Sequence, residues 1–447
     1  MMENFREKID AIVVGAGPAG ISAALTIKRG GKNVVVLERA ETAGQKNMFG
    51  GAVYLNSIKS ILPNSYNTAP YERFMTNHTY SFLTDEETVN ISAASKNETT
   101  ATVFRPKFDK WLVEEAKKEG VFIAPRTLVK KLIYKNGNVT GVQTEQEKFF
   151  APVVILADGV NSLLAKQIGL RSEFFPKDMV LSVKETLKLD KKVMEERFQL
   201  DEGSKEGAMY EFFGGLSEMR IVKKNKKRLI TPFAIGFLYT FKDSISIGLG
   251  VSLEDLANYK MKPYELLEKF KSHKHVAKLI KGAEAQEYSA HLIPEFGYNN
   301  LPRLYANGVM VVGDAAGLVN SAHFEGTNFA IESGKLAGET AVIAINLKNA
   351  RHNILKIYEE KLKKSFVLKD LKSYRNVVEK LYSRKKSILH YYPKKMAELF
   401  ETVTCVDNIP KKRKFRAFAG KIFFERSITE LFRDFKAFLK LFFDIMF

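Results

Sequence analysis

The sequence predicts an α/β fold in which a parallel-sheet domain is interrupted by an antiparallel sheet and followed by a helical region. Residues Ile9–Val14 are largely apolar and β-branched, a glycine-rich turn and a helix follow them, and Asn33–Glu38 repeats the buried-strand pattern. This order is a complete βαβ unit, which is typical of parallel sheets. Between about Lys177 and Pro294 the pattern changes to short strand-like runs, which indicates an inserted antiparallel sheet. From about Arg351 onward the chain is lysine-rich and helical in pattern.

Further elements of the first domain occur on both sides of the insertion. They are a helix at Phe108–Lys118, strands at Val121–Ala124, Thr127–Tyr134, Val139–Thr144, Pro152–Leu156 and Gly308–Val312, and a helix from about Gly326 to Leu347. We therefore expect a discontinuous first domain at 1–175 and 300–345. We expect the antiparallel-sheet domain at 176–299 and a helical, basic region at 346–447.

Composition and charge narrow the class of protein. Hydrophobic residues make up 45% of the 447 residues and charged residues 27%, which is typical of a folded globular chain. The formal net charge of +19 favours anionic partners: nucleic acid, acidic proteins or a lipid surface, although a basic solvated surface would also account for it. The charged N-terminus does not resemble a signal peptide, and no apolar stretch approaches the ~20 residues of a membrane span. We expect the chain to be cytoplasmic.

The chain has one cysteine, Cys405. A cysteine-ligated iron–sulfur cluster needs about four thiolates, so the chain cannot hold one alone. We interpret Cys405 as a small apolar residue rather than a nucleophile. The seven histidines show neither a Ser-His-Asp pattern nor metal-ligand spacing, so we assign no catalytic residue and no metal.

The glycine-rich turn predicts a dinucleotide site. Gly15 permits the tight turn, Gly17 lets the backbone approach a pyrophosphate, and Gly20 allows close packing of helix on strand. The helix that follows presents unpaired N–H groups and a positive dipole end to the phosphates. Glu38 ends the second strand, where it can accept hydrogen bonds from ribose hydroxyls. The turn reads Gly15-Ala16-Gly17-Pro18-Ala19-Gly20.

Two later motifs favour FAD over NAD. Ala157-Asp158-Gly159 ends a strand in mid-chain, and Gly313-Asp314-Ala315 ends another far downstream. Asp314 could accept a hydrogen bond from a ribityl hydroxyl. It could instead cap the helix that follows, and the two roles can coexist.

Together with Arg105-Pro106-x-Phe108-Asp109-x-x-Leu112, these motifs resemble the FAD fold of the glutathione-reductase/hydroxylase type, a Rossmann-like fold shared with geranylgeranyl reductases. The resemblance implies that the first domain binds FAD and that Arg105 reaches the cofactor. The alternative is a surface arginine that pairs with Asp109 at i+4. We also expect Arg39 and Val129 beside the cofactor.

Finer features are similar to the FixC-type branch of the electron-transfer-flavoprotein:quinone oxidoreductases. They are Gly44–Gly51, Gly236–Thr240, Pro294–Tyr298 and His323–Gly334. The resemblance implies an FAD that takes electrons from an electron-transfer flavoprotein and passes them toward quinone. Larger relatives carry a domain that binds an iron–sulfur cluster, and this chain has too few cysteines to bind one. A small ferredoxin-like partner is therefore implied.

Two glycine-rich segments would then lie near the flavin ring. Gly326, Thr327 and Asn328 open a helix whose N–H groups could face the flavin carbonyl edge, against an alternative of simple capping by Thr327 or Asn328. Gly50 and Gly51 would let the backbone approach the ring, against an alternative of an ordinary loop.

The C-terminal tail is amphipathic. Lys411–Arg416 is a basic cluster, and apolar residues recur with helical spacing from Ile428 onward. Charges interrupt the helix too often for a membrane span, so we expect an interfacial helix on the inner face of the cell membrane. The alternative is packing on the protein's own core or on a partner. Nucleic-acid binding would require aromatic residues interleaved with basic ones on an exposed sheet, which the sequence does not indicate.

The sequence thus predicts an FAD-dependent oxidoreductase that passes electrons from an electron-transfer flavoprotein to quinone, to a ferredoxin-like partner, or to both. One alternative is a geranylgeranyl-reductase-like enzyme that saturates a prenyl lipid. Another is a non-catalytic membrane-docked scaffold that retains FAD structurally.

Overall fold

The computed structural model describes residues 9–45, 51–84, 86–96, 98–173, 175–216, 219–223, 226–230 and 232–446. The chain forms two compact units. The first unit comprises Met1–Met75, Lys96–Val180 and Ser289–Arg375. The second comprises Thr76–Ser95, Leu181–Tyr288 and Asn376–Phe447. Each unit is therefore assembled from three separate segments of the chain.

A six-stranded sheet forms the centre of the first unit. Its strand order is β19-β20-β11-β1-β2-β7, and all neighbours are parallel except the edge strand β19. The bounds are β1 (Ala11–Val14), β2 (Val34–Leu37), β7 (Phe122–Ala124), β11 (Val153–Leu156), β19 (Tyr305–Ala306) and β20 (Val309–Val311). Every residue of β1, β2, β11 and β20 is buried, as expected for a parallel sheet covered on both faces.

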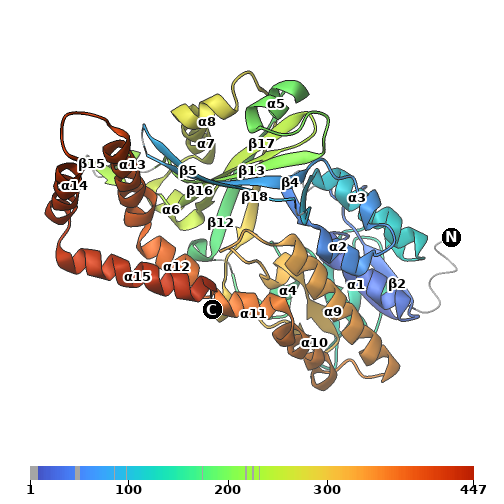
Figure 1. Ribbon diagram of the computed structural model, residues 1–447. Helices are drawn as coiled ribbons and strands as arrows, with labels where there is room; N and C mark the ends of the chain where they lie inside the picture. Colours follow the sequence, from blue (N-terminus) through green and yellow to red (C-terminus); the bar gives the residue numbers. More distant parts are fainter. Residues whose placement is uncertain are drawn as a thin grey trace. The chain divides into compact units, whose positions relative to one another are not determined.

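Two long helices pack against each other in this unit, α1 (Pro18–Arg29) and α9 (Thr327–Asn346) (Figure 1). Glycines allow their close approach, because a Cβ added at Gly334 would lie 2.0 Å from the carbonyl oxygen of Ala19. The sequence pattern predicts a helix at Ile21–Arg29 after the glycine turn, and the helix begins three residues earlier, at Pro18, since proline is well suited to the first helical position. The other helices are α2 (Leu55–Ile61), α3 (Arg105–Lys118), α4 (Leu163–Gln167), α10 (His352–Lys364) and α11 (Phe366–Ser373).

The first unit also contains antiparallel strand pairs. β3 (Gly51–Tyr54) pairs with β6 (Thr100–Val103), and β8 (Val129–Lys135), β9 (Asn138–Thr144) and β10 (Lys148–Phe150) form an antiparallel meander. A short 3-10 turn, η5 (Gly313–Ala316), follows β20.

The second unit is built on strands in the order β18-β12-β17-β16-β13-β4, with β5 paired to β4. Their bounds are β4 (Phe74–Leu83), β5 (Thr88–Ala94), β12 (Met179–Lys188), β13 (Glu206–Gly214), β16 (Ala234–Thr240), β17 (Ser244–Ser252) and β18 (Glu284–Pro294). A separate hairpin joins β14 (Met219–Lys223) to β15 (Lys226–Ile230).

Helices cover one face of this sheet (Figure 1). Phe212 of β13 and Leu238 of β16 are fully buried there, and the ring of Phe212 lies 5.2 Å from that of Phe270. The opposite face, which carries Glu211, Phe237 and Tyr239, is only half-buried. The helices are α5 (Lys191–Phe198), α6 (Leu253–Tyr259), α7 (Pro263–Ser272) and α8 (Lys274–Leu279).

The C-terminal part of the second unit is helical. It contains α12 (Val377–Ser383), the π-helical turn η6 (Ser387–Tyr391), α13 (Tyr392–Thr404), α14 (Lys411–Glu425) and α15 (Ile428–Met446) (Figure 1). In the part of the chain that the structure describes, no helix is long and apolar enough to cross a membrane. The predicted α/β architecture, with its antiparallel sheet and helical C-terminal region, is confirmed.

Candidate functional site

The candidate site lies where the parallel strands of the first unit end. Because carboxyl ends of parallel strands meet at one edge of a sheet, the segments after β1, β2, β11 and β20 come together. The turns after β1 and β11 are in contact. Gly15 has a φ of +103°, and a Cβ added there would lie 2.3 Å from the carbonyl oxygen of Ala157. Only glycine suits this position.

The N-terminus of α1 is open toward its surroundings. No described atom would lie within 4 Å of a Cβ at Gly17, and no described side chain caps the helix. Gly20, in contrast, is tightly enclosed, because a Cβ there would lie 2.0 Å from the carbonyl oxygen of Gly15. Pro18 and Ala19 form the buried first turn. The helix therefore presents free N–H groups and a positive dipole end to an open space.

Glu38 follows β2 directly and is held by the backbone. One carboxylate oxygen accepts the N–H of Ala16 at 2.9 Å, and the other accepts the N–H of Ala40 at 2.8 Å. Each oxygen has a second lone pair, so the carboxylate can still accept hydrogen bonds from a ligand. The neighbouring Arg39 lies close enough for its charge to lower the pKa of Asp158.

Asp158 is a carboxylate with one unsatisfied oxygen. Its Oδ2 accepts the N–H of Leu164 at 3.4 Å, while its buried Oδ1 has no hydrogen-bond partner among the described residues. Burial raises the pKa of Asp158 to about 6, against the opposing effects of the Leu164 N–H and the charges of Arg171 and Arg39. The next residue, Gly159, has a φ of +74°. A buried acceptor without a partner is expected where a bound polar group completes the site.

Asp314 lies in the η5 turn and interacts with three basic groups. Burial raises its pKa, and the charges of His291, Arg105 and Arg171 oppose that shift. The turn is fixed by the N–H of Gly313, which donates to Oγ of Ser333 at 3.0 Å. Asp314 is not part of α9, which begins only at Thr327.

Arg105 is the first residue of α3. Its Nε donates to Oδ1 of Asp109 at 2.8 Å and its Nη2 to Oδ2 at 2.9 Å. The i+4 pair considered as an alternative is therefore present. The side chain is only 18% exposed, however, so Arg105 is not a surface arginine. Its charge also reaches Asp314.

Arg171 and His291 were not predicted from the sequence. Arg171 is 6% exposed, its Nη1 donates to the carbonyl oxygen of Ala315 at 3.1 Å, and its guanidinium lies 4.6 Å from the ring of Phe296. Burial lowers its pKa to about 10 despite the charges of Asp158 and Asp314. Arg171 therefore links the turns after β11 and β20. The signal that could have found it is an arginine that directly follows the apolar Leu170.

The remaining predicted residues are distributed around this edge or lie outside it. Gly326, Thr327 and Asn328 begin α9, where no described side chain caps the helix, and Oδ1 of Asn328 is buried without a partner among the described residues. Gly51 opens β3 and pairs with Val103. Val129 is 8% exposed and packs in the core. Gly50 lies outside the described residues.

The residues at this edge are compatible with a dinucleotide. The uncapped helix end and the open space at Gly17 suit a pyrophosphate, and the unsatisfied oxygens of Asp158 and Asn328 suit donors on the bound group. Within the described ranges, no cluster of three or more His, Cys, Asp or Glu side chains is arranged to hold a metal ion.

Comparisons with known proteins agree with this geometry. The FAD binding domain family matches residues 8–204, and the ETF-QO/FixC family C-terminal domain matches residues 378–442. Protein FixC of Bradyrhizobium diazoefficiens is 37% identical over 441 residues, which cover 96% of this chain and 97% of FixC. The probable electron transfer flavoprotein-quinone oxidoreductase YdiS of Escherichia coli is 35% identical over 93% of this chain and 96% of its own.

Solved structures share the fold at low sequence identity. A geranylgeranyl bacteriochlorophyll reductase-like protein from Thermoplasma acidophilum superimposes with a TM-score of 0.67 at 20% identity, over 83% of this chain and 87% of that chain. The flavin-dependent brominase Bmp2 gives a TM-score of 0.62 at 14% identity, over 94% of this chain and 100% of that chain. At these identities the likeness shows the fold alone.

The fold and the dinucleotide site define an FAD-dependent oxidoreductase, as the FAD binding domain match also shows. The similarity to FixC proteins, which are 36–38% identical over 92–96% of this chain, identifies the family more specifically than the fold does. The chain belongs to the FixC branch of the electron-transfer-flavoprotein:quinone oxidoreductase family, and its cofactor is FAD.

Proposed function

We propose that this protein passes electrons through FAD from an electron-transfer flavoprotein to quinone, to a ferredoxin-like partner, or to both. The observation that carries the proposal is the likeness to YdiS, whose name states both an electron-transfer flavoprotein and quinone, over 93% of this chain. The single cysteine supports a separate ferredoxin-like partner, because a cysteine-ligated cluster needs about four thiolates.

Bound FAD supplies reversible electron transfer, and the protein must bind, orient and stabilise it. In this proposal the N-terminus of α1 and the open space at Gly17 hold the pyrophosphate, and Glu38 accepts from the ribose. Asp314 accepts from the ribityl chain, and Arg105 and Arg171 keep that carboxylate charged. The N-terminus of α9 stabilises the reduced ring with its N–H groups. We propose residues 1–175 and 300–345 as the FAD-binding domain.

The half-buried sheet face of the second unit supports a quinone acceptor. The rings of Phe237 and Tyr239 lie 5.2 Å apart with planes 19° from parallel, and those of Phe82 and Phe213 lie 5.4 Å apart at 22°. Flat aromatic side chains suit a planar quinone ring. Glu211 pairs with Phe237 across β13 and β16, so its side chain shares this face.

Glu211 gives this face an acid suited to quinone chemistry. The described residues provide no hydrogen bond to its side chain, and burial raises its pKa to about 7. Reduction of a quinone to a quinol consumes two electrons and two protons. An acid whose pKa lies near neutral pH can both donate a proton and be recharged from solvent. We propose that Glu211 supplies one of these protons to a quinone bound on this face.

A prenyl-lipid reductase of the geranylgeranyl type is the second candidate. It is supported only by the fold likeness to the Thermoplasma acidophilum protein at 20% identity. The FixC relatives at 36–38% identity favour the first candidate. We also propose that the protein works at the inner face of the cell membrane and contacts it through the C-terminal tail, since quinones reside in the bilayer.

Parallel assays under anaerobic conditions test these candidates. The purified protein is given its reduced electron-transfer flavoprotein together with a menaquinone analogue, a small ferredoxin or a prenyl lipid. We expect oxidation of the donor to be coupled to reduction of the quinone or the ferredoxin, with the prenyl lipid unchanged. Saturation of the prenyl chain would support the second candidate. Absence of turnover with every acceptor would leave FAD as a structural cofactor.

A further inference from the structure

Helix α15 buries a charged residue and exposes apolar ones. An amphipathic surface helix normally buries its apolar side and exposes its charged side. In α15, Asp434 is 2% exposed, whereas Phe432 is 67% and Phe435 is 62% exposed. The outer face of α15, defined as Ile428, Phe432, Phe435 and Leu439, forms one stripe, because these residues follow each other at intervals of four, three and four.

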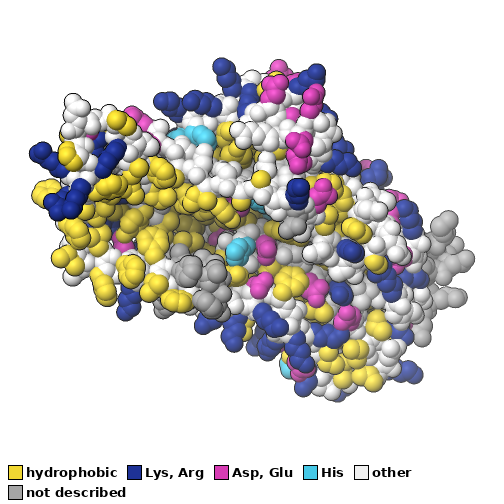
Figure 2. Space-filling view, in the orientation of Figure 1, with side chains coloured by type: hydrophobic (Ala, Val, Ile, Leu, Met, Phe, Trp, Pro, Cys, Tyr) yellow, Lys and Arg dark blue, Asp and Glu magenta, His cyan; other side chains and the backbone are white. Residues whose placement is uncertain are grey.

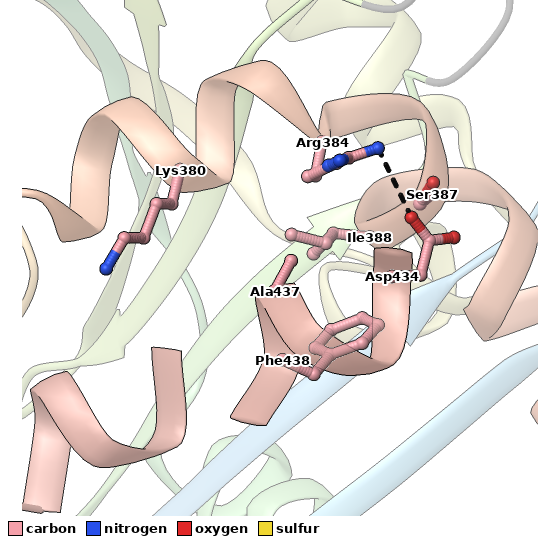
Figure 3. Close-up of a pocket in the computed structure, with 7 residues that line it drawn as sticks. All are labelled: Lys380, Arg384, Ser387, Ile388, Asp434, Ala437 and Phe438. Atoms are coloured by element: carbon pink, nitrogen blue, oxygen red, sulfur yellow. Dashed lines mark hydrogen bonds and ion pairs between the residues drawn. The ribbon is translucent and has the colours of Figure 1, made fainter. Parts of the chain in front are cut away.

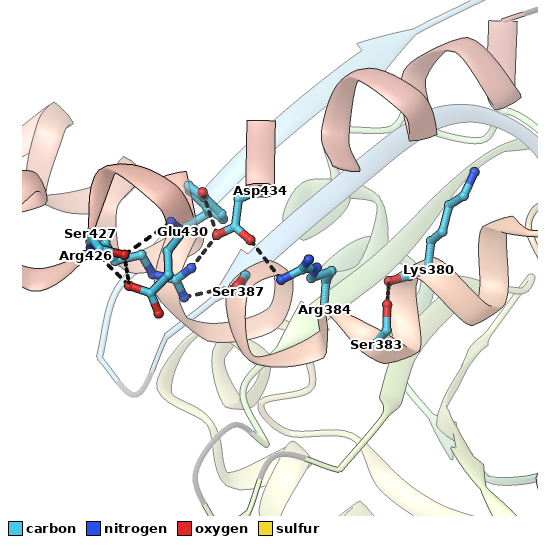
Figure 4. Close-up of polar contacts among 9 residues, drawn as sticks. Lys380, Ser383, Arg384, Ser387, Arg426, Ser427, Glu430 and Asp434 are labelled. Atoms are coloured by element: carbon cyan, nitrogen blue, oxygen red, sulfur yellow. Dashed lines mark hydrogen bonds and ion pairs between the residues drawn. The ribbon is translucent and has the colours of Figure 1, made fainter. Parts of the chain in front are cut away.

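An ion-pair cluster around Asp434 holds this orientation. Its carboxylate accepts from Nη1 of Arg426, from Nη1 of Arg384 at 3.4 Å and from the hydroxyl of Tyr392 at 3.0 Å (Figure 4). Nη2 of Arg426 also donates to Oγ of Ser387 at 3.0 Å. These partners come from the end of α12, from η6, from α13 and from the connection between α14 and α15, so the cluster fastens α15 to the helices around it.

The contact beneath α15 is closely packed. Asp434, Ala437 and Phe438 face Arg384 and Ser387 across a cavity of only about 10 Å³ (Figure 3). The ring of Phe438 lies 5.0 Å from that of Tyr392. A buried carboxylate is tolerated only when it is paired, so rolling α15 to bury its outer face would expose the cluster and separate its charges. The outer face therefore stays exposed.

Basic residues accompany this exposed apolar face. Arg433 and Lys436 are exposed on α15, next to the outer face, and Lys411, Lys412 and Arg413 are exposed at the start of α14. Figure 2 shows hydrophobic side chains gathered over α14 and α15, with lysine and arginine side chains along the edge of α14. Residues 411–447 contain ten Lys and Arg and four Asp and Glu, a net charge of 10 − 4 = +6.

We propose that the outer face of α15 inserts into an anionic lipid bilayer, and that the Asp434 cluster is the device that keeps this face turned outward. The inference rests on the membrane contact proposed above. It adds which face of α15 enters the bilayer, that the lipid is anionic, and that the Asp434 cluster holds the helix in this orientation. Exposed phenylalanines beside basic residues are the pattern of an interfacial helix on anionic headgroups. The combination of a basic edge with an exposed apolar stripe favours an anionic lipid surface as the occupant, because such a surface offers charged headgroups beside an apolar interior.

Sedimentation of the full-length holoprotein with vesicles tests this proposal. We expect binding to phosphatidylcholine vesicles that contain phosphatidylglycerol, and at least tenfold weaker binding to phosphatidylcholine alone. The double variant Phe432→Glu/Phe435→Glu should lose at least tenfold in binding to the anionic vesicles. Phe150→Glu is the matched control, since Phe150 is 57% exposed in the first unit, and its binding should not change. Asp434→Ala should also weaken binding, because α15 is then free to bury its outer face.

A second measurement does not depend on how well the glutamate variants fold. An environment-sensitive dye is attached to the single thiol of the variant Phe432→Cys/Cys405→Ser. Its emission should shift to the blue with anionic vesicles, and the same dye in Phe150→Cys/Cys405→Ser should not shift. Equal binding by wild type and Phe432→Glu/Phe435→Glu, with no dye shift, would overturn the inference but leave the membrane contact standing. A wild-type protein that binds no vesicles would overturn both and point to a protein partner.

Discussion

Substitutions at Gly20 and Gly17, two glycines of the same turn, should affect different properties. Gly20→Ala should mainly lower the stability of the fold, whereas Gly17→Val should mainly weaken FAD binding. At Gly20, a Cβ would lie 2.0 Å from the carbonyl oxygen of Gly15, about 1.5 Å inside an ordinary contact of about 3.5 Å. Both groups belong to the backbone, so neither can rotate away. Overpacking costs about 1–3 kcal/mol, and the higher helix propensity of alanine offsets about 1 kcal/mol of it. Because neither group can move away, the cost should lie at the upper end of this range, so Gly20→Ala should reduce the free energy of unfolding by about 2 kcal/mol.

At Gly17 the expected effect is on the cofactor. Its backbone is extended, with φ −75° and ψ 178°, which valine can adopt, and no described atom would obstruct the new side chain. Valine is a poorer N-cap residue than glycine, so Gly17→Val should lower the free energy of unfolding of the apoprotein by about 0.5–1 kcal/mol. The side chain would fill the space proposed for the pyrophosphate, so FAD affinity should fall at least about a hundredfold, equivalent to about 3 kcal/mol.

Flavin absorbance of the purified variants and thermal unfolding of the apoproteins measure these two effects separately. We expect Gly17→Val to be colourless but only slightly less stable than wild type, and Gly20→Ala to be the less stable of the two variants. A yellow, fully loaded Gly17→Val would refute the placement of the pyrophosphate. A Gly17→Val apoprotein that unfolds as easily as Gly20→Ala would show that the space at Gly17 is not open.

Other predictions concern Glu211, Arg171 and α15. The raised pKa of Glu211, about 7, means that the folded protein binds more protons than the unfolded chain between the ordinary carboxyl pKa and pH 7. Its contribution to stability should therefore fall as pH rises through this range, and Glu211→Gln should remove that slope in unfolding titrations. Quinone reduction should slow above pH 7 in wild type, and an unchanged pH profile in Glu211→Gln would contradict the proton-donor role. Tyr80→Phe is the control, because burial and the charge of the nearby Glu211 raise the pKa of Tyr80. Arg171→Gln should raise the pKa values of Asp158 and Asp314 further, because the charge of Arg171 opposes their protonation. It should therefore weaken FAD binding more than Arg171→Lys does at low and neutral pH, where the carboxyl groups become protonated, and less at high pH; equal binding by both variants at all pH values would argue against an electrostatic role. Loss of vesicle binding in Phe432→Glu/Phe435→Glu is expected for the reasons given above.

The parts of the fold that repeat a simple pattern could be predicted from the sequence. The strands on either side of the glycine turn are short, apolar and β-branched because both of their faces are buried, and such runs are easily recognised. The segment between β2 and α3 was not assigned. Its strands β4 and β5 are rich in polar residues and have one or both faces exposed, so they lack a clear alternation.

Contacts between distant segments could not be predicted. Asp158 and Asp314 are recognisable because glycines flank them at strand ends. Arg171 stands outside any motif, and its role depends on the fold, which brings it to Ala315. For helix α15, the orientation could not be predicted from the sequence. Helical spacing identified the two sides of α15 but not which side faces the protein. That choice depends on the pairing of Asp434 with Arg384 and Arg426, which are 50 and 8 residues away.

Anaerobic rapid mixing of the FAD-loaded protein with reduced electron-transfer flavoprotein, followed by a second mixing with a menaquinone analogue, tests the central claim most directly. The flavin spectrum of this protein is followed in both steps. We expect bleaching of its FAD in the first step and recovery of the oxidised spectrum in the second, with one quinol formed for each two-electron cycle. An FAD that stays oxidised with the reduced flavoprotein, or that stays reduced in the presence of both quinone and ferredoxin, would contradict the proposed electron transfer.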